Sequence, residues 1–255
     1  MVILIAFVAL WYLSLFCQTF FQHRYAAHGS FKMSKFWEKA FFILTYVTQG
    51  PSYLSPRAYA IMHRMHHAYT DTPMDPHSPS YSKNVFDMMW KTKVIYSDIF
   101  NEKVVVEDRF LKNLPDWRPF DKFAHSNFSR LLWAAVYIGL FAYFASNPFV
   151  WLLLPFALVM GPLHGAVINW YAHKYGYDNF KMKNTAHNLF SVDILMLGES
   201  YHNNHHQFPS SVNFGRRWHE LDPVYPVIKM LAWMRIIKLK KPIMIEKKQL
   251  DKQAV

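Results

Sequence analysis

Histidine is the residue type whose spacing in this chain points to chemistry. Nine of the fourteen histidines lie in three short clusters and one further position, next to long apolar runs. The four segments are His23-Arg-Tyr-Ala-Ala-His28, His63-Arg-Met-His66-His67, Asn169-Trp-Tyr-Ala-His173 and His202-Asn-Asn-His205-His206. Imidazole is the commonest metal ligand in proteins. Nine imidazoles are too many for one ion and about right for two, so the sequence predicts two metal ions near a membrane surface.

Helical spacing explains how side chains within a cluster come together. Two clusters have the spacing i, i+3, i+4, which places three side chains on one face of an α-helix. These clusters are His63, His66 and His67, and His202, His205 and His206. Asn169 and His173 are four residues apart and also share a face. His23 and His28 are five apart, so we expect them at a helix end, one on the last turn and one just beyond it.

Each cluster taken alone also has an ordinary explanation as a solvated run or a hydrogen-bonded interfacial histidine. We expect no ligand among the other five histidines, which are His77, His125, His164, His187 and His219. His77 is the exception among them, because we expect it to support a metal ligand. A metal-bound imidazole needs a partner on its second ring nitrogen. By proximity in sequence, the candidate partners are Asp71, Asp75 and Glu199.

Iron is the metal that suits this set of donors. Imidazole binds zinc, copper, iron and nickel. Zinc has no redox chemistry and rarely needs nine histidines, whereas two irons with nitrogen ligands can use dioxygen to take hydrogen from an unactivated C–H bond. The apolar runs beside the clusters suggest that this bond belongs to an acyl chain.

The apolar runs define the elements that must position these residues. Runs of about 20 apolar residues match a membrane-spanning helix, and we predict spans at about 1–22, 128–146 and 149–172. The run 36–49 is shorter and is expected to be interfacial. The turn Ser146-Asn147-Pro148 makes the last two spans an antiparallel hairpin. We predict an all-α integral membrane protein of one domain, 1–255, whose helical cap carries the histidines on the parts 23–127 and 173–255.

Charge and cysteine content constrain orientation and partners. The net charge is +11 and follows the histidine-bearing side, so the positive-inside bias makes that side and the C-terminus cytoplasmic. No nucleic-acid-binding motif accompanies the charge, and we expect no nucleic-acid partner. Cys17 is the single cysteine, which excludes a disulfide framework and a cysteine-ligated cluster within this chain. Electrons must therefore come from a separate protein.

The histidine boxes resemble those of the membrane-bound fatty acid desaturases, especially the stearoyl-CoA (delta-9) branch. The boxes have the forms H-x4-H, H-x2-H-H and H-x2-H-H. Four further stretches are similar to segments of that family, namely Thr70 to His77, Asn169 to Tyr177, Gly198 to Pro209, and Trp218 to Pro223. The likeness covers roughly residues 10–240.

The resemblance implies a non-heme centre of two iron ions and the insertion of a cis double bond, expected at the delta-9 position. It also implies a membrane-lipid setting and a separate electron donor of the ferredoxin or cytochrome type. By motif matching, the metal ligands are His23, His28, His63, His66, His67, His173, His202, His205 and His206, with Asn169 reaching one metal through a water.

Two departures from the family pattern leave the substrate open. The family usually has four spanning helices, and only one apolar run precedes the first box here, so a first helix is either absent or truncated. Ile61 stands where acyl-CoA members carry an arginine. The substrate is therefore an acyl-CoA, an acyl-lipid or an acyl carrier, and Lys83, Lys91 and Lys93 are candidates for a phosphate contact. Phe7 or Trp11 is expected to close the far end of an acyl tunnel.

Two alternative functions remain. A histidine-rich membrane hydroxylase or ketolase acting on a lipid would use the same metal chemistry. A heme-binding electron carrier or another metal-binding membrane protein is a different class, and it requires facing histidines on two spanning helices, whereas the clusters here lie outside the apolar runs.

Overall fold

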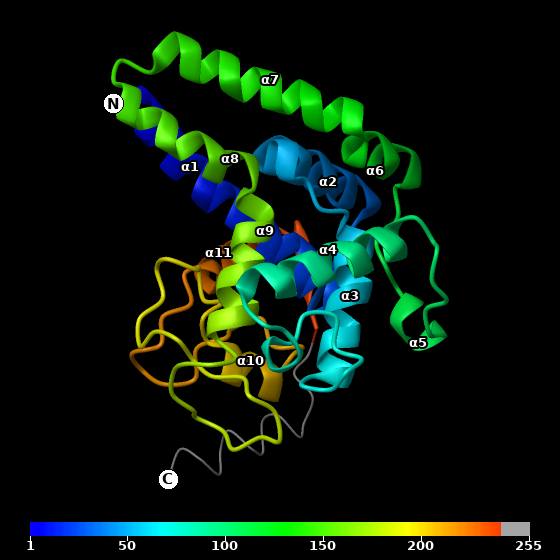
Figure 1. Cartoon of the computed structure of the whole chain (residues 1–255). Helices are drawn as coiled ribbons and strands as arrows, with labels where there is room; N and C mark the ends of the chain where they lie inside the picture. The colour runs from blue at the N-terminus through cyan, green and yellow to red at the C-terminus, as the bar shows by residue number, and fades with distance from the viewer. Residues whose placement is uncertain (241–255) are drawn as a thin grey trace.

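The computed structural model of the chain describes residues 1–240 and is mostly helical (Figure 1). The all-α prediction holds apart from one short two-stranded sheet. The α-helices are α1 (Val2–Phe16), α2 (Lys35–Gln49), α3 (Pro56–Tyr69), α4 (Val85–Phe100), α5 (Asp108–Leu111), α6 (Arg118–His125), α7 (Asn127–Phe144), α8 (Leu154–Leu158), α9 (Met160–Ala166), α10 (His202–Gln207) and α11 (Val224–Trp233). The π-helices are η1 (Cys17–Ala27) and η5 (Val167–Tyr171), and the 3-10 helices are η2 (Gly50–Ser52), η3 (Pro79–Tyr81) and η4 (Pro148–Leu153). The strands β1 (Phe31–Met33) and β2 (Ile237–Leu239) pair antiparallel.

The first predicted span lies within one continuous helix. α1 and η1 together form the helix Val2–Ala27, which is long and apolar enough to cross a membrane. Its first half exposes apolar side chains such as Leu4 and Ile5, which suits contact with lipid tails. Its second half is buried. The helix therefore runs from an apolar end of the molecule into the folded interior, and it carries His23 there.

The third predicted span is bent rather than straight, which corrects the expectation of a single helix over 149–172. It forms η4, α8, α9 and η5, and its two halves, Pro148–Leu158 and Met160–Tyr171, are bent by 72° at Val159. Pro162 explains the break, because its ring clashes with the carbonyl of Leu158 four residues earlier and it donates no hydrogen bond. The two halves together count as one candidate span.

The remaining predicted membrane elements are helical. The run 128–146 forms α7, capped by the Ser126 hydroxyl, which accepts from the Ser129 amide. α7 is not among the helices of residues 1–240 that are long and apolar enough to cross a membrane, so its crossing stays a prediction. The run 36–49 forms α2, which buries Phe42 and exposes Phe36, as an interfacial helix would.

The core packs around η1. Phe20, Phe21 and Phe42 form an aromatic cluster that joins η1 to α2 and to α11. Figure 1 shows α7, α8 and the N-terminal half of α1 at one end of the molecule, and α10 with long connecting loops at the other. α3 lies against η1 between these ends. The predicted basic tail residues Lys247, Lys248 and Lys252 lie outside the described residues, as does the end of the predicted part 173–255.

Candidate metal centre

The π-helix η1 brings His23 and His28 together. A π-helix bonds each amide to the carbonyl five residues earlier, so residues five apart lie above one another. The amide of His28 donates to the carbonyl of His23 at 3.1 Å, and the two ring centroids are 5.0 Å apart. His28 caps the end of the helix, as the spacing predicted. Spacing alone did not show that the helix is of the π type.

The helix α3 contributes to two separate groups of histidines. Pro56 starts the helix, and the Ser55 hydroxyl accepts from the amide of Ala58 to cap it. At 100° per residue, His66 lies about 60° from His63 and about 100° from His67. His63 and His67 therefore point to one group, and His66 points to the other. The three share one half of the helix, but they do not converge on one point.

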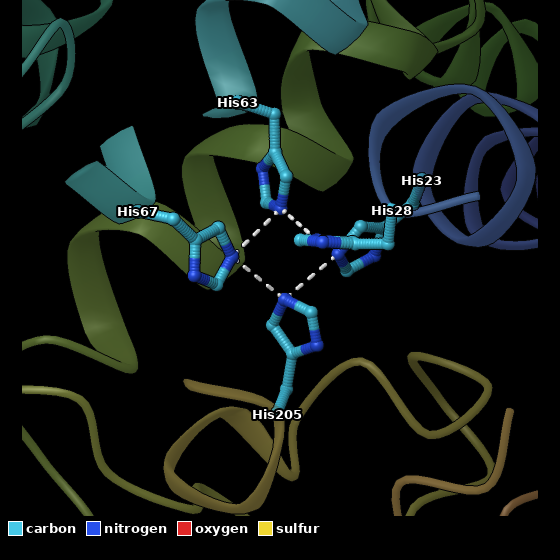
Figure 2. Close-up of side chains that lie close together, drawn as sticks. All are labelled: His23, His28, His63, His67 and His205. Atoms are coloured by element: carbon cyan, nitrogen blue, oxygen red, sulfur yellow. Dashed lines mark hydrogen bonds between the residues drawn. The ribbon is translucent and has the colours of Figure 1, made fainter. Parts of the chain in front are cut away.

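The first group contains five histidines from three elements, namely η1 with its C-cap, α3 and α10. Its members are His23, His28, His63, His67 and His205. Figure 2 shows their rings turned toward a common centre, with Nε2 innermost in the four contacts that are drawn. The Nε2 atoms are 2.9 Å apart for His28 and His63, 3.0 Å for His63 and His67, and 2.9 Å for both other contacts, His67 to His205 and His205 to His23.

The second group contains four histidines. Its members are His66, His173, His202 and His206. Their Nε2 atoms are 3.2 Å apart for His66 and His206, 3.0 Å for His173 and His202, and 3.1 Å for His202 and His206. α10, like α3, contributes to both groups, because His205 belongs to the first group and His202 and His206 belong to the second. All nine histidines singled out by the sequence are brought together in these two groups.

These distances fit a metal ion in each group. Histidine nitrogens bind first-row metals at about 2.1 Å, so two ligands at right angles are about 3 Å apart. The contacts between Nε2 atoms have that length. The ligand atoms of each group all lie within 4.8 Å of one another. Either group can therefore surround a single ion.

Carboxylates beside the Nδ1 atoms determine which ring nitrogen carries the proton, and therefore whether Nε2 presents a lone pair. Asp75 lies 2.9 Å from Nδ1 of His66, and Glu199 lies 2.7 Å from Nδ1 of His23. A carboxylate only accepts hydrogen bonds, so each Nδ1 carries the proton and each Nε2 presents a lone pair. Converging lone pairs repel one another unless a cation lies between them. This arrangement is the strongest argument for metal in the structure.

Asp71 supports a third histidine through a hydroxyl. The Thr185 hydroxyl donates to Asp71 at 3.0 Å, and Nδ1 of His173 is 3.2 Å from the same hydroxyl oxygen. Because the Thr185 hydroxyl directs its proton at Asp71, the hydroxyl oxygen accepts from Nδ1 of His173. The Nε2 of His173 therefore also presents a lone pair. All three carboxylates proposed from the sequence therefore lie behind a histidine of the two groups.

Burial keeps the histidines in the neutral form that binds metal. It lowers the pKa of His173 to about 4. For the others with a resolved shift, burial and then repulsion from neighbouring histidines lower the pKa well below its usual value; these are His28, His63, His66, His67, His202, His205 and His206.

A buried arginine holds the carboxylate behind His23. Arg24 is fully buried, donates to Asp222 at 2.7 Å and contacts Glu199 at 3.4 Å. Burial alone would raise the pKa of Glu199, but His23 and Arg24 outweigh it, so the pKa is lowered. Gly198 fits beside Asp222 with a φ of 90°, where a Cβ would lie 2.7 Å from the carboxylate. The sequence reasoning missed Arg24, although its place directly after His23 was visible.

A small cavity lies between the two groups. It has a volume of about 40 Å³, and its lining includes His23 and His63 of the first group and His202 of the second. Asn169 also lines it, and η5 presents this residue. The structure thus places Asn169 beside the histidine groups. His77, which was expected to support a ligand, and His164, which was expected to be an ordinary histidine, line the same cavity.

A large groove leads from the surface to this cavity. Its volume is about 1000 Å³, and it shares Gln18, Tyr59, Met62, Gly165 and Asn169 with the small cavity. Lys93 and Lys122 line the groove and are exposed. Of the two other lysines proposed for a phosphate, Lys91 is paired with Asp87 at 2.8 Å, and Lys83 does not line the groove.

The family model for fatty acid desaturases matches residues 1–233 of this chain. The chain belongs to the fatty acid desaturase family. It is an oxygen-dependent oxidoreductase of fatty acid metabolism, and the family is membrane-associated and uses iron. The two histidine groups of this desaturase are of the kind that could bind that metal.

Curated relatives of the desaturase act on different positions and carriers. The chain is 29% identical to the delta-9 desaturase-like 2 protein of Arabidopsis thaliana, over 83% of this chain and 68% of that protein. It is 27% identical to an acyl-CoA 5-desaturase of Anemone leveillei, over 92% and 71%. It is 29% identical to the sn-1 stearoyl-lipid 9-desaturase of Synechocystis, over 85% and 64%.

Proposed function

We propose that the desaturase holds two iron ions, one in each histidine group. The first would be bound by His23, His28, His63, His67 and His205. The second would be bound by His66, His173, His202 and His206, with Asn169 reaching it through a water. The observation that supports this proposal is the convergence of nine ring nitrogens on two points, with carboxylates behind three of the histidines, His23, His66 and His173.

The substrate path follows the groove and the small cavity. We propose that an acyl chain lies in the groove and that its reacting carbons lie in the cavity between the two groups. The bound iron would supply the dioxygen-derived oxidant that removes two hydrogens. Met62 and Gly165 line both spaces and leave room for methylenes, while the surrounding protein excludes bulk water. Positioning by these walls would decide which bond becomes the cis double bond.

We propose the delta-9 position for the double bond and leave the carrier open between acyl-CoA and acyl-lipid. The relatives named 9-desaturases support the position, and the relative named a 5-desaturase makes the bond position the quantity to measure. Lys93 and Lys122 at the groove are suited to a phosphate of either carrier.

The membrane arrangement and the electron supply complete the proposal. We propose three spans, at about 1–22, 128–146 and the bent segment 149–172, with the histidine groups and the C-terminus in the cytoplasm. Electrons would come from a separate ferredoxin- or cytochrome-type donor. The basic charge of the histidine-bearing side supports this orientation and would attract an acidic donor.

Expression in a host of known lipid composition tests the function. Lipids from cells with the wild-type chain should gain a monounsaturated species whose mass is two units lower than that of its saturated parent, and cleavage at the double bond gives its position. His66→Ala should abolish this species, because it removes a ligand together with the role of Asp75. A gain of 16 mass units instead would indicate a hydroxylase. Full activity of the variant would contradict the ligand assignment.

A further inference from the structure

The short sheet places two lysines opposite each other. In the ladder of β1 and β2, Lys32 is the direct partner of Lys238. Like charges that face each other across a ladder destabilise it. Both side chains are exposed, and within residues 1–240 no carboxylate pairs with either of them. The two-stranded sheet therefore carries a concentrated positive charge that an anion would neutralise.

These lysines lie in an open groove that holds a third cation. The groove has a volume of about 640 Å³ and is lined by Lys32, Lys238 and Arg235, together with Ser34 and Trp37 from the start of α2. Arg235 is exposed and follows α11. Three cations and a hydroxyl around one space are typical of a site for a phosphate group.

The nearest acidic side chain on α2 does not neutralise this groove. Glu38 is buried and accepts from the Lys35 ammonium at 2.7 Å and from the Tyr25 hydroxyl at 2.5 Å. It does not line the groove. The carboxylate is therefore engaged elsewhere, and the positive charge of the groove stays available to a ligand.

Apolar surface flanks the groove on two sides. Phe36 at the start of α2 is 71% exposed, and Trp233 at the end of α11 is 83% exposed. β1 begins four residues after Ala27, where the long apolar helix ends. Exposed aromatic side chains beside a cationic site, near the end of a spanning helix, are typical of the membrane–water interface.

We propose that this groove binds the headgroup of an anionic phospholipid. The phosphate would lie between the two lysines and Arg235, and the acyl tails would follow the exposed apolar side of α2. A lipid fits better than a soluble phosphate because the aromatic flanks would otherwise stay in water. This site lies outside the histidine groups and does not depend on the proposed function.

Native mass spectrometry of the purified full-length protein tests the site directly. The protein is offered equal amounts of phosphatidylglycerol and phosphatidylcholine, and the retained lipid is counted. Lys32→Glu is the test variant, because an opposite charge across from Lys238 should keep the two strands paired. Lys103→Glu is the control, since Lys103 is an exposed lysine that does not line the groove. The wild type should prefer phosphatidylglycerol, and Lys32→Glu should lower that preference about fivefold or more.

Each other outcome has a defined meaning. Equal retention of both lipids by the wild type would overturn the proposal, as would a preference that survives in Lys32→Glu. Equal losses in Lys103→Glu and Lys32→Glu would show a response to net charge only. Displacement of the lipid by inorganic phosphate would indicate a soluble anion site. Lys238→Gln should also lower the preference for phosphatidylglycerol, and its melting temperature should equal that of the wild type. None of these measurements uses desaturation.

Discussion

At the scale of single residues, the second ring nitrogen of each histidine decides whether the groups can hold metal. Asp75, Glu199 and the Asp71–Thr185 pair each fix one histidine with its Nε2 lone pair directed inward. The sequence allowed these carboxylates to be chosen, because they lie close to the boxes. It did not show which histidine each one serves, since Asp71 acts on His173 across about a hundred residues.

Replacement of Asp75 by asparagine should weaken iron binding. The amide can still accept from His66 but no longer fixes the ring with a charge, and losses of this kind are typically about 10- to 100-fold in affinity. Iron titration against a chelator measures the change. Asp178→Asn is the matched control, because Asp178 bonds the surface histidine His187 at 2.7 Å. Equal affinity in the two variants would contradict a supporting role for Asp75.

His125 should make the protein less stable in acid. Burial, followed by repulsion from Arg130 and Arg118, lowers its pKa to about 3. The unfolded chain takes up this proton below about pH 6.5, whereas the folded chain does not until near its lower pKa, so stability is lost as the pH falls between these values.

His125→Phe should keep the ring stacking on Phe100, which is 3.8 Å between centroids, and remove the titration. Between about pH 7.5 and pH 5 the variant should lose about 1–2 kcal/mol less stability than the wild type. Melting curves at the two pH values measure this difference. Parallel losses in the two proteins would show that His125 does not contribute.

At the scale of elements, close contact between η1 and α3 sets the geometry of the first group. Ala26 and Ala27 of η1 pack against Ala60 of α3, and all three are buried. Small side chains let the two helices approach closely enough for His28 and His63 to meet. The sequence predicted helices in both places, but helical periodicity could not show the π-type turn or the contact between two distant segments.

Ala60→Leu should separate these helices. Extra methylenes in a packed site cost about 1–3 kcal/mol, and the shift should move His63 away from His28 and reduce bound iron. Ala135→Leu is the control, because Ala135 lies on the exposed side of α7. Iron content and melting temperature are measured on both. Full iron content in Ala60→Leu would show that the contact does not position the histidines.

The third apolar run, residues 149–172, shows how much of the fold could be predicted from the sequence. Apolar composition predicted a helix over 149–172, and the residues are helical. The break at Val159 was also visible in principle, because Pro162 excludes a normal turn there. The role of the cavity-lining His164 had no such signal, since its neighbours in space come from η1 and α1.

At the scale of the whole molecule, the groove and the small cavity form a path that ends at apolar residues of α1 and η5. Leu15, Ile168 and Met196 line the inner cavity and pack with Trp11. Trp11 also donates to the Leu195 carbonyl at 3.3 Å. Of the two residues expected at the end of a tunnel, Trp11 touches this cluster and Phe7 does not.

Trp11→Ala should therefore lengthen the path. The variant should accept acyl chains longer than those the wild type prefers, because the space behind Leu15 becomes available. Phe7→Ala is the control on the same helix and should leave the distribution unchanged. Chain lengths of the unsaturated products, read by mass spectrometry, measure the effect. An unaltered profile in Trp11→Ala would place the end of the path elsewhere.

The division of α3 and α10 between both histidine groups has a consequence for assembly. Neither helix can be ordered by one group without also arranging donors of the other, so we expect the two groups to bind metal cooperatively. Under the proposal of one iron per group, an ion that enters one group would order donors of the other, and an ion that leaves would loosen both. When iron is limiting, molecules that hold two ions and molecules that hold none should therefore dominate, and molecules with one ion should be scarce.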